Sequence, residues 1–372
     1  MFSFSKDFDF SEIKNIRNIV KLDTFSNKVV FVNGFSASGK TMVSPIISSI
    51  DNTESTIFPY EIEWVASLFY AQQITEKAFV EFIKQYCDHS IYNQMMSRNT
   101  NFRIGDISTV CNKKDFLKYF FRLFIKGDNF IPDIIEKKQP ISCYTTSHLI
   151  FFVNEIFQAL KDRCLFIETV RDPIYMFKQI KILFTDVYQH NPKKIFSFMA
   201  ESKKEHSLFF DFFSEESAFV DLKMLSNINS VCVNYLERIF SFYFNLDFNK
   251  IDSNKSLFIL LPFEKFVASP DVWIENILTF LKKTKSKKFI AELKKQNVPR
   301  KILTDGIKRK VYERYGYEPH PKSSMSFEDA DSLYISEIKK LFSNQEFSDF
   351  ERLLAISKKY RNWINNFSKF TF

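Results

Sequence analysis

The stretch "KVVFVNGFSASGKTMV" (28–43) decides the fold. Its first part is apolar and β-branched, ends in Asn-Gly, and predicts a short buried strand. The residues that follow fit G-x-x-x-x-G-K-(S/T), from Gly34 through Gly39 and Lys40 to Thr41. A loop of this kind between a strand and a helix binds phosphate, because the first amides of the helix point at the anion. The stretch therefore predicts a phosphate site.

Each of these residues has a physical reason to be there. Gly34 permits the turn after the strand, and Gly39 lets the backbone approach the ligand. Lys40 adds a positive charge, and the hydroxyl of Thr41 is available to an oxygen or a magnesium ion. The pattern alone leaves two ligands open: the tail of a nucleoside triphosphate, or the 5′ end of another nucleotide donor.

Further strands are predicted along the chain, separated by segments with helical periodicity. "ISCYTTSHL" (141–149) alternates, "CLFIETV" (164–170) is a buried run closed by "RDP", and "SLFILLPFEKF" (256–266) is another. Strands that alternate with helices indicate a parallel sheet. The predicted fold class is therefore α/β, a P-loop three-layer fold with a central parallel sheet. One domain over 1–372 is expected, with helical insertions at about 65–135 and 180–250.

Composition limits the function classes. The net charge of +8 over 372 residues suits an anionic ligand, but its dispersed basic residues do not predict a nucleic-acid partner. The five cysteines form no C-x-x-C pair, which indicates a reduced compartment. The N-terminus lacks a signal-peptide pattern, and no apolar stretch is long enough for a transmembrane segment. A cytoplasmic localisation is expected.

Three further motifs accompany the loop in a fixed order: "DNTESTIFPYEIEW" (51–64), "VRDP" (170–173) and "LPFEKFVASPDVWIENILTFLKK" (261–283). Together with the loop, this order and spacing resembles the sulfotransferase family. These P-loop-fold enzymes take a sulfuryl group from 3′-phosphoadenosine 5′-phosphosulfate (PAPS). The resemblance covers roughly 28–65, 140–180 and 255–335, and its weight lies in the combination.

The resemblance implies a set of residues for the nucleotide donor. In the family a loop ending in S-G-T-T holds the 5′-phosphosulfate, so Ser38, Gly39, Lys40 and Thr41 would surround that group, together with Gly34. Ala37 stands where the family often has Lys or Arg, and the positive charge is found at Lys40 instead.

The family also holds the 3′-phosphate with an Arg after a strand and a Ser eight residues later. Arg171 matches the Arg, and Gln179 stands at the place of the Ser. A strand-ending turn in which Arg171 pairs with a carboxylate is the structural alternative. Glu264, in "PFEKF", is expected to be structural. Arg300, Lys301 and Gly306 are weaker candidates in the late basic segment.

Sulfuryl transfer needs a base for the acceptor, and the family supplies Glu or His. Glu61 and Glu63 follow the "FPY" turn, and Glu61 is favoured because of its place directly after that turn. His148, at the end of "CYTTSH", is the other candidate. Lys40 would stabilise the charge on the bridging oxygen as it leaves.

The expected reaction moves a sulfuryl group from PAPS to a hydroxyl or amine, with no metal required. The sequence does not name the acceptor, and a glycan and a small metabolite are both candidates. An ATP-dependent small-molecule kinase or NTPase is the alternative, because Lys40 completes a Walker-type loop. Against it, a kinase needs Mg²⁺ and usually an Asp at a second strand end, where this chain has Glu168. A non-catalytic nucleotide-binding relative is the third reading.

Overall fold

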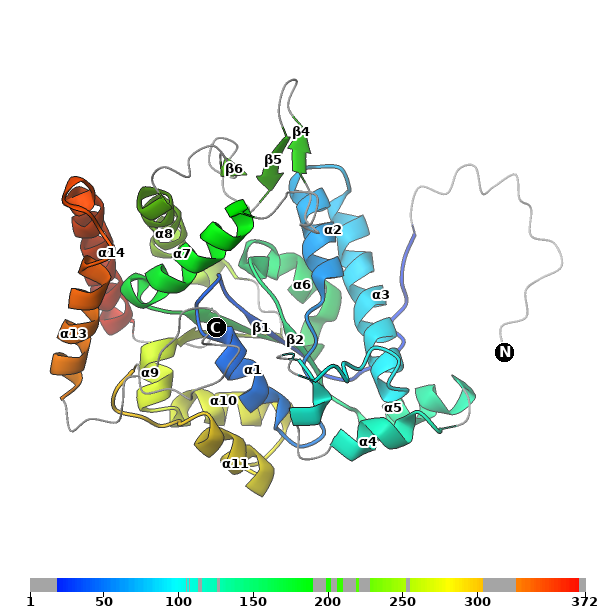
Figure 1. Cartoon of the computed structure of the whole chain (residues 1–372). Helices are drawn as coiled ribbons and strands as arrows, with labels where there is room; N and C mark the ends of the chain where they lie inside the picture. Colours follow the sequence, from blue (N-terminus) through cyan, green and yellow to red (C-terminus); the bar gives the residue numbers. More distant parts are fainter. Residues whose placement is uncertain are drawn as a thin grey trace.

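A four-stranded parallel sheet lies at the centre of the computed structural model (Figure 1). The strand order is β2-β1-β3-β7, and every neighbouring pair is parallel. The bounds are β1 (Val29–Asn33), β2 (Ser142–Thr145), β3 (Cys164–Val170) and β7 (Leu257–Pro262). The predicted α/β fold class with a central parallel sheet is confirmed.

The structure describes residues 19–104, 106, 108–112, 116–125, 128–189, 199–201, 206–209, 219–220, 228–251, 255–303 and 326–367. Gly306 therefore lies outside the described residues.

The sheet is apolar because helices cover both of its faces, as in other parallel sheets. Its register aligns Phe31 with Tyr144 on one side and with Phe166 on the other, and Phe166 with Phe258. The ring centroids of Phe31 and Phe166 lie 6.0 Å apart, and those of Phe166 and Phe258 lie 5.9 Å apart. A row of buried rings therefore crosses all four strands and fixes their register.

Helices fill the connections between the strands. Between β1 and β2 lie α1 (Lys40–Ser48), α2 (Tyr60–Tyr70), α3 (Glu76–Met95), α4 (Phe116–Arg122) and α5 (Ile131–Lys138); α6 (Val153–Leu160) precedes β3. After β3 come α7 (Pro173–Gln189) and α8 (Ile228–Asn245), and after β7 come α9 (Phe263–Ala268), α10 (Asp271–Leu281), α11 (Lys287–Lys295), α13 (Phe327–Lys339) and α14 (Phe347–Asn366). The helices α7, α8, α13 and α14 gather on one side of the sheet, whereas α2 and α3 lie on the other (Figure 1). None of the described helices is long and apolar enough to cross a membrane.

The helical insertion expected at about 180–250 also contains short strands. Three short antiparallel strands follow α7, with bounds β4 (Met199–Glu201), β5 (His206–Phe209) and β6 (Phe219–Val220). Runs of two to four residues are too short for their periodicity to separate strand from helix. The segment contains three short strands between the helices α7 and α8.

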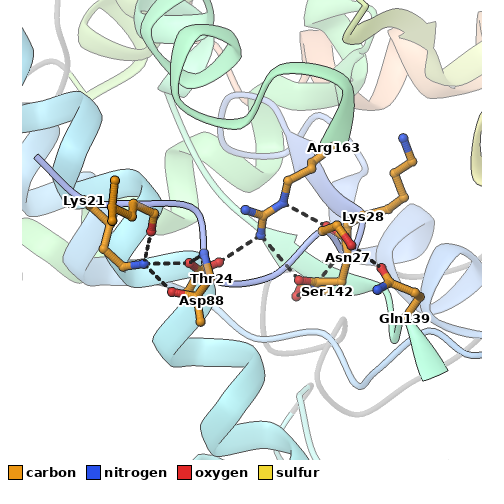
Figure 2. A network of polar contacts seen from close by, with 10 residues as sticks. Lys21, Thr24, Asn27, Lys28, Asp88, Gln139, Ser142 and Arg163 are labelled. Carbon is orange, nitrogen blue, oxygen red and sulfur yellow. Dashed lines mark hydrogen bonds and ion pairs between the residues drawn. The ribbon is translucent and has the colours of Figure 1, made fainter. Parts of the chain in front are cut away.

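A buried polar network holds the edge of the sheet where the strands begin (Figure 2). Asp88, on α3, pairs with Arg163 at 3.0 Å and with Lys21 at 2.9 Å. Arg163, just before β3, also donates through Nε to the carbonyl of Asn27, which precedes β1, at 3.0 Å. The network therefore ties α3 to the starts of two strands, at the edge opposite to the phosphate loop.

Candidate active site

The loop between β1 and α1 has a backbone that requires glycine at two positions. Gly34 has φ 153° and Gly39 has φ 100°, both in the region that side chains disfavour. A Cβ on Gly34 would lie 2.3 Å from Oγ1 of Thr169, and one on Gly39 would lie 2.3 Å from the ring of Phe263. The chain has six glycines, and two are placed where no other residue fits.

The loop lies where the sheet topology favours a ligand. The strand before it, β1, has β2 on one side and β3 on the other, so the chain leaves β1 in one direction and later returns on the opposite side. In open parallel sheets, ligands bind beyond the carboxyl ends of the strands at such a switch point. The predicted phosphate loop therefore sits at the expected binding edge.

Hydrogen bonds to β3 hold the loop in shape. The hydroxyl of Ser38 lies 2.7 Å from that of Thr169, and Thr169 donates to the carbonyl of Asn33 at 2.8 Å. Ser38 also donates its N–H to the carbonyl of Phe35 at 3.2 Å. At the start of α1, the N–H groups of Gly39 and Lys40 donate to no described backbone carbonyl, as expected in a first helical turn. These amides are available to an anion.

Lys40 points across the loop to the end of β2. Its ammonium group donates to the carbonyl of Gly34 at 2.6 Å and to the hydroxyl of Ser147. Burial lowers the pKa of Lys40 to about 8, although the nearby carboxylates of Glu63 and Glu168 act to raise it. Lys40 therefore carries its charge at neutral pH within a partly desolvated site, where a charge acts strongly.

The two carboxylates of "FPYEIEW" have different surroundings. Glu61 is exposed, and it accepts a hydrogen bond from the hydroxyl of Tyr86 at 3.3 Å. Glu63 is half-buried and accepts the N–H of Ser147 at 2.6 Å. Burial raises the pKa of Glu63 to about 7, while Lys40 and the Ser147 amide act to lower it. The sequence favours Glu61 as the base, whereas the geometry favours Glu63.

A third carboxylate, Glu168, is fully buried on β3. It accepts hydrogen bonds from the side-chain amide of Asn33 at 2.6 Å and from the hydroxyl of Tyr243. Burial raises its pKa to about 7, whereas those two hydrogen bonds and Lys40 act to lower it. Both of its oxygens are bonded within the protein, so Glu168 sets the field at Lys40 and is not directed at a ligand.

His148 lies next to Ser147 in a left-handed backbone conformation, with φ 62°. Its ring centroid lies 5.0 Å from that of Phe35. Burial, followed by the charge of Lys40, lowers the pKa of His148 to about 3. An imidazole of that pKa is a weak base, so His148 is less suited to proton abstraction than Glu63.

Arg171 follows β3 and reaches the other side of the loop. Only 6% of it is exposed, and one terminal nitrogen donates to the carbonyl of Ala37 at 3.4 Å. Ala37 has a left-handed backbone conformation, with φ 67°. Nε of Arg171 is buried without a hydrogen-bond partner among the described residues. No described carboxylate lies within ion-pair distance of Arg171, although its charge acts to lower the pKa of the buried Glu264, which burial raises. The structural alternative for "VRDP", an Arg171–carboxylate pair, is thus not found within the described residues.

A second buried guanidinium lies on the same aromatic ring. Phe263, the first residue of α9, has the guanidinium carbon of Arg171 at 4.6 Å from its centroid and that of Arg300 at 5.5 Å. Arg300 donates to the carbonyls of Gln296 and Leu303, at 3.3 and 3.2 Å. Because the Phe263 ring also packs against Gly39, both arginines are held close to the loop.

The acidic residue of "VRDP" is used to fix the turn that carries Arg171. Asp172 accepts from Nε of Arg361 at 2.6 Å and caps α7 through the N–H of Ile174 at 3.0 Å. Its own N–H donates to Glu264 at 2.8 Å. Glu264 also accepts from the hydroxyl of Tyr360 at 2.9 Å. These hydrogen bonds agree with the structural role expected for Glu264.

The remaining sequence candidates, Thr41 and Gln179, lie on α1 and α7. Thr41 is half-buried in the first turn of α1. Gln179 is half-buried on α7, four residues after Tyr175, whose ring lies 5.7 Å from the guanidinium carbon of Arg171. Residues four apart share a helix face, so Gln179 is on the face that carries Tyr175. No hydrogen bond joins the backbone of Gln179 to the loop among the described residues.

Sequence reasoning missed some of these residues. It gave no role to Ser147, which joins Lys40 to Glu63, or to Phe263, which joins two arginines to Gly39. The signal for Phe263 was the aromatic position of "PFEKF", read only as a turn. The described residues contain no cluster of three or more His, Cys, Asp or Glu side chains that suits a metal ion.

The fold and site define an α/β protein whose predicted phosphate loop lies at the switch point of its sheet. No family model matches the chain, and no curated protein is similar to it in sequence. Among solved structures it is similar to the sulfotransferase STF1 from Mycobacterium tuberculosis H37Rv, with 10% sequence identity and a TM-score of 0.30. The similarity covers 87% of this chain and 79% of that one. At this level it says nothing about the reaction, which has to be inferred from the chain's own residues.

Proposed function

We propose that this protein is a sulfotransferase that uses PAPS as its donor. The observation that carries the proposal is Arg171, a buried guanidinium with no carboxylate partner among the described residues, at the rim of a phosphate loop. A buried charge is costly unless it is compensated. An anionic group of the ligand, separate from the one in the loop, would supply that compensation.

The site suits a nucleotide with two separate anionic groups. The first turn of α1 and Lys40 would bind the 5′-phosphosulfate. Arg171 would bind the 3′-phosphate, and Arg300 lies on the same Phe263 ring. A guanidinium is the side chain best matched to the oxygens of a phosphate group. Two anion positions on either side of Gly39 favour a 3′,5′-bisphosphorylated donor.

The proposed reaction transfers the sulfuryl group of PAPS to a hydroxyl of the acceptor. The acceptor hydroxyl oxygen attacks the sulfur, a new O–S bond forms, and the bond from sulfur to the bridging phosphate oxygen breaks. The hydroxyl proton passes to the carboxylate of Glu63, and the electron pair leaves on the phosphate of 3′,5′-ADP. Lys40 would stabilise that developing charge. A base with a pKa about 7 is well placed for proton abstraction near neutral pH.

An aromatic pair marks the side from which the acceptor would approach. Tyr60 and Trp64 are exposed on α2, and their near-parallel rings have centroids 6.4 Å apart. On a helix, positions 60, 63 and 64 share one face, so these rings flank Glu63. Open aromatic surfaces stack on the flat faces of rings. We propose that the acceptor is a sugar or another hydroxyl-bearing ring that stacks on this pair.

One observation favours the second candidate, an ATP-dependent kinase. Lys40 follows Gly39 directly and takes the place that the lysine of a Walker-type loop has. A kinase also needs carboxylates for Mg²⁺. Glu168 is the acidic residue on β3, the strand beside β1. One of its oxygens accepts a hydrogen bond from Asn33 and the other from Tyr243, so neither is directed at a metal ion. This argues for a donor that needs no metal.

A nucleotide screen separates the two candidates. Thermal unfolding is followed with 3′,5′-ADP in EDTA and with ATP in excess Mg²⁺. Because a ligand stabilises the state that binds it, 3′,5′-ADP is expected to raise Tm and MgATP is not. The reverse pattern would identify a kinase, and stabilisation by neither would identify a relative without this nucleotide site.

A further inference from the structure

The guanidinium of Arg361, on α14, joins two carboxylates that lie far apart in the chain. Its Nε donates to Asp172, in the turn after β3, at 2.6 Å. Its two terminal nitrogens donate to the two oxygens of Asp331, on α13, at 2.7 and 2.9 Å. Each nitrogen of the group is thus used within the protein. The role of Arg361 therefore lies in what its two partners hold.

The first partner, Asp172, follows Arg171 directly in the chain. The carboxylate of Asp172 is buried, and it also accepts a hydrogen bond from the hydroxyl of Ser357, on α14, at 2.7 Å. Burial raises the pKa of Asp172, and the charge of Arg361 is the largest effect that opposes the rise. Helix α14 therefore supplies a cation and a hydroxyl group that fix the backbone next to Arg171.

The second partner, Asp331, leads back to Arg171 by a separate route. Asp331 accepts the hydroxyl of Tyr175 at 2.6 Å, and the Tyr175 ring lies 5.7 Å from the guanidinium carbon of Arg171. The same ring stacks on that of Tyr334, on α13, with centroids 4.6 Å apart. A ring that is held at its hydroxyl and at one face gives a guanidinium a fixed partner. The two routes that leave Arg361 therefore meet at Arg171.

The distribution of charge agrees with this arrangement. Asp172 and Asp331 both lie within ion-pair distance of Arg361, at 2.6 and 2.7 Å. No carboxylate of the described part of the chain lies within that distance of Arg171. The nearby acids are thus neutralised by Arg361, and Arg171 is left for an anion of the ligand.

We propose that Arg361 is a positioning residue of the donor site. Through Asp172 and Asp331 it orders the guanidinium of Arg171 before the 3′-phosphate binds. A long side chain that is already ordered loses less conformational entropy on binding. The inference rests on the function proposed above. It concerns only the 3′-phosphate, so the loss of Arg361 should affect only ligands that carry that group.

The test is a double-mutant cycle, measured by calorimetric titration of the full-length chain with 3′,5′-ADP and with AMP. Arg361→Met removes the charge and keeps a long side chain. It should bind 3′,5′-ADP about 3- to 10-fold more weakly, as expected when one side chain has to be ordered on binding, and AMP within about twofold of wild type. In an Arg171→Ala background the same substitution should cause no further loss, because an effect carried by Arg171 disappears without it.

The matched control is Arg352→Met, on the same helix. The side chain of Arg352 is 39% exposed and that of Arg361 is 36% exposed, and Arg352 also pairs with two carboxylates, Glu237 and Asp349. Its loss should leave the affinity for both nucleotides unchanged. If the circular dichroism spectrum shows that Arg361→Met does not fold, the cycle is run with Arg361→Lys. That variant keeps the charge without the planar fork, so it should show a smaller loss of the same kind.

Three results would overturn the proposal and leave Arg361 with a purely structural role. They are an unchanged affinity for 3′,5′-ADP, an equal loss for 3′,5′-ADP and AMP, and equal losses in the wild-type and Arg171→Ala backgrounds. Failure of the proposed function would look different. In that case wild type would not bind 3′,5′-ADP, or Arg171→Ala would bind it as well as wild type does, and the inference would be wrong together with the donor site.

Discussion

Lys40 and Glu63 reach the same residue, Ser147, from two different helices. The ammonium group of Lys40 donates to the Ser147 hydroxyl, and the Glu63 carboxylate accepts the Ser147 N–H at 2.6 Å. The ammonium group and the carboxylate are thus held by one short turn after β2; in the proposed reaction the first would face the leaving oxygen and the second the acceptor. Their closeness explains why each moderates the effect of burial on the pKa of the other.

Replacement of the proposed base should slow turnover strongly and leave the donor site intact. For Glu63→Gln we expect sulfuryl transfer to fall by about 10²- to 10⁴-fold, because general-base catalysis contributes about that much. The affinity for 3′,5′-ADP should stay within about twofold, since Gln keeps the hydrogen bond from Ser147. Steady-state kinetics and calorimetry measure the two effects.

The control is Glu61→Gln, which changes an exposed carboxylate two residues away. It should transfer sulfuryl groups at nearly the wild-type rate, and so should His148→Gln if it folds normally. A loss in Glu61→Gln equal to that in Glu63→Gln would return the role of base to Glu61.

The rate should have a bell-shaped dependence on pH. Glu63 must be deprotonated to act as a base, so kcat/KM should rise as the pH approaches its pKa of about 7. Lys40 must stay charged, so kcat/KM should fall above its pKa of about 8. Initial rates between pH 5 and 10, in buffers of equal ionic strength, test this. Lys40→Arg should lose the alkaline limb, and a flat wild-type profile would argue against this pair.

The aromatic pair on α2 should affect the acceptor and not the donor. Trp64→Ala is expected to raise KM for a ring-shaped acceptor about 2- to 10-fold, which matches an aromatic contact of about 0.5–1.5 kcal/mol. Trp64→Phe keeps a ring and should show a smaller effect. Equal KM values for the Ala variant and wild type would place the acceptor elsewhere.

The buried network at the far edge of the sheet should contribute to stability alone. Asp88→Asn leaves Arg163 without its buried carboxylate, and we expect it to lower the free energy of unfolding by about 3–5 kcal/mol. The matched control is Asp128→Asn, which breaks an exposed pair with Arg98 and should cost less than about 1 kcal/mol. Urea unfolding of both variants gives the comparison; similar losses would show that burial does not decide the effect.

The strands and the two glycine positions of the loop after β1 could be predicted from sequence because their signals are local. The strand predicted at 164–170 coincides with β3, since its apolar run and the "RDP" turn mark both of its ends. One detail goes against local propensity: α1 begins at Lys40 and includes Pro45. A proline in the second turn loses one hydrogen bond, and packing against the sheet outweighs that cost.

The relations across the site could not be predicted, because they join residues far apart in the chain. Nothing near Glu63 in the sequence shows that it would face Ser147 and Lys40 while Glu61 faces water. The spacing of the two carboxylates says only that they point differently. Likewise, the contact of Phe263 with Arg171, Arg300 and Gly39 depends on how α9 is placed after β7.

The most direct test of the proposed donor site is calorimetric titration of wild type and two Arg171 variants with 3′,5′-ADP and with AMP. Arg171→Ala should weaken binding of 3′,5′-ADP by about 10- to 100-fold, as expected for a charged hydrogen bond. It should change AMP binding little, and Arg171→Lys should recover part of the loss. Equal losses for 3′,5′-ADP and AMP would show that Arg171 does not bind a 3′-phosphate and would contradict the assignment of the donor.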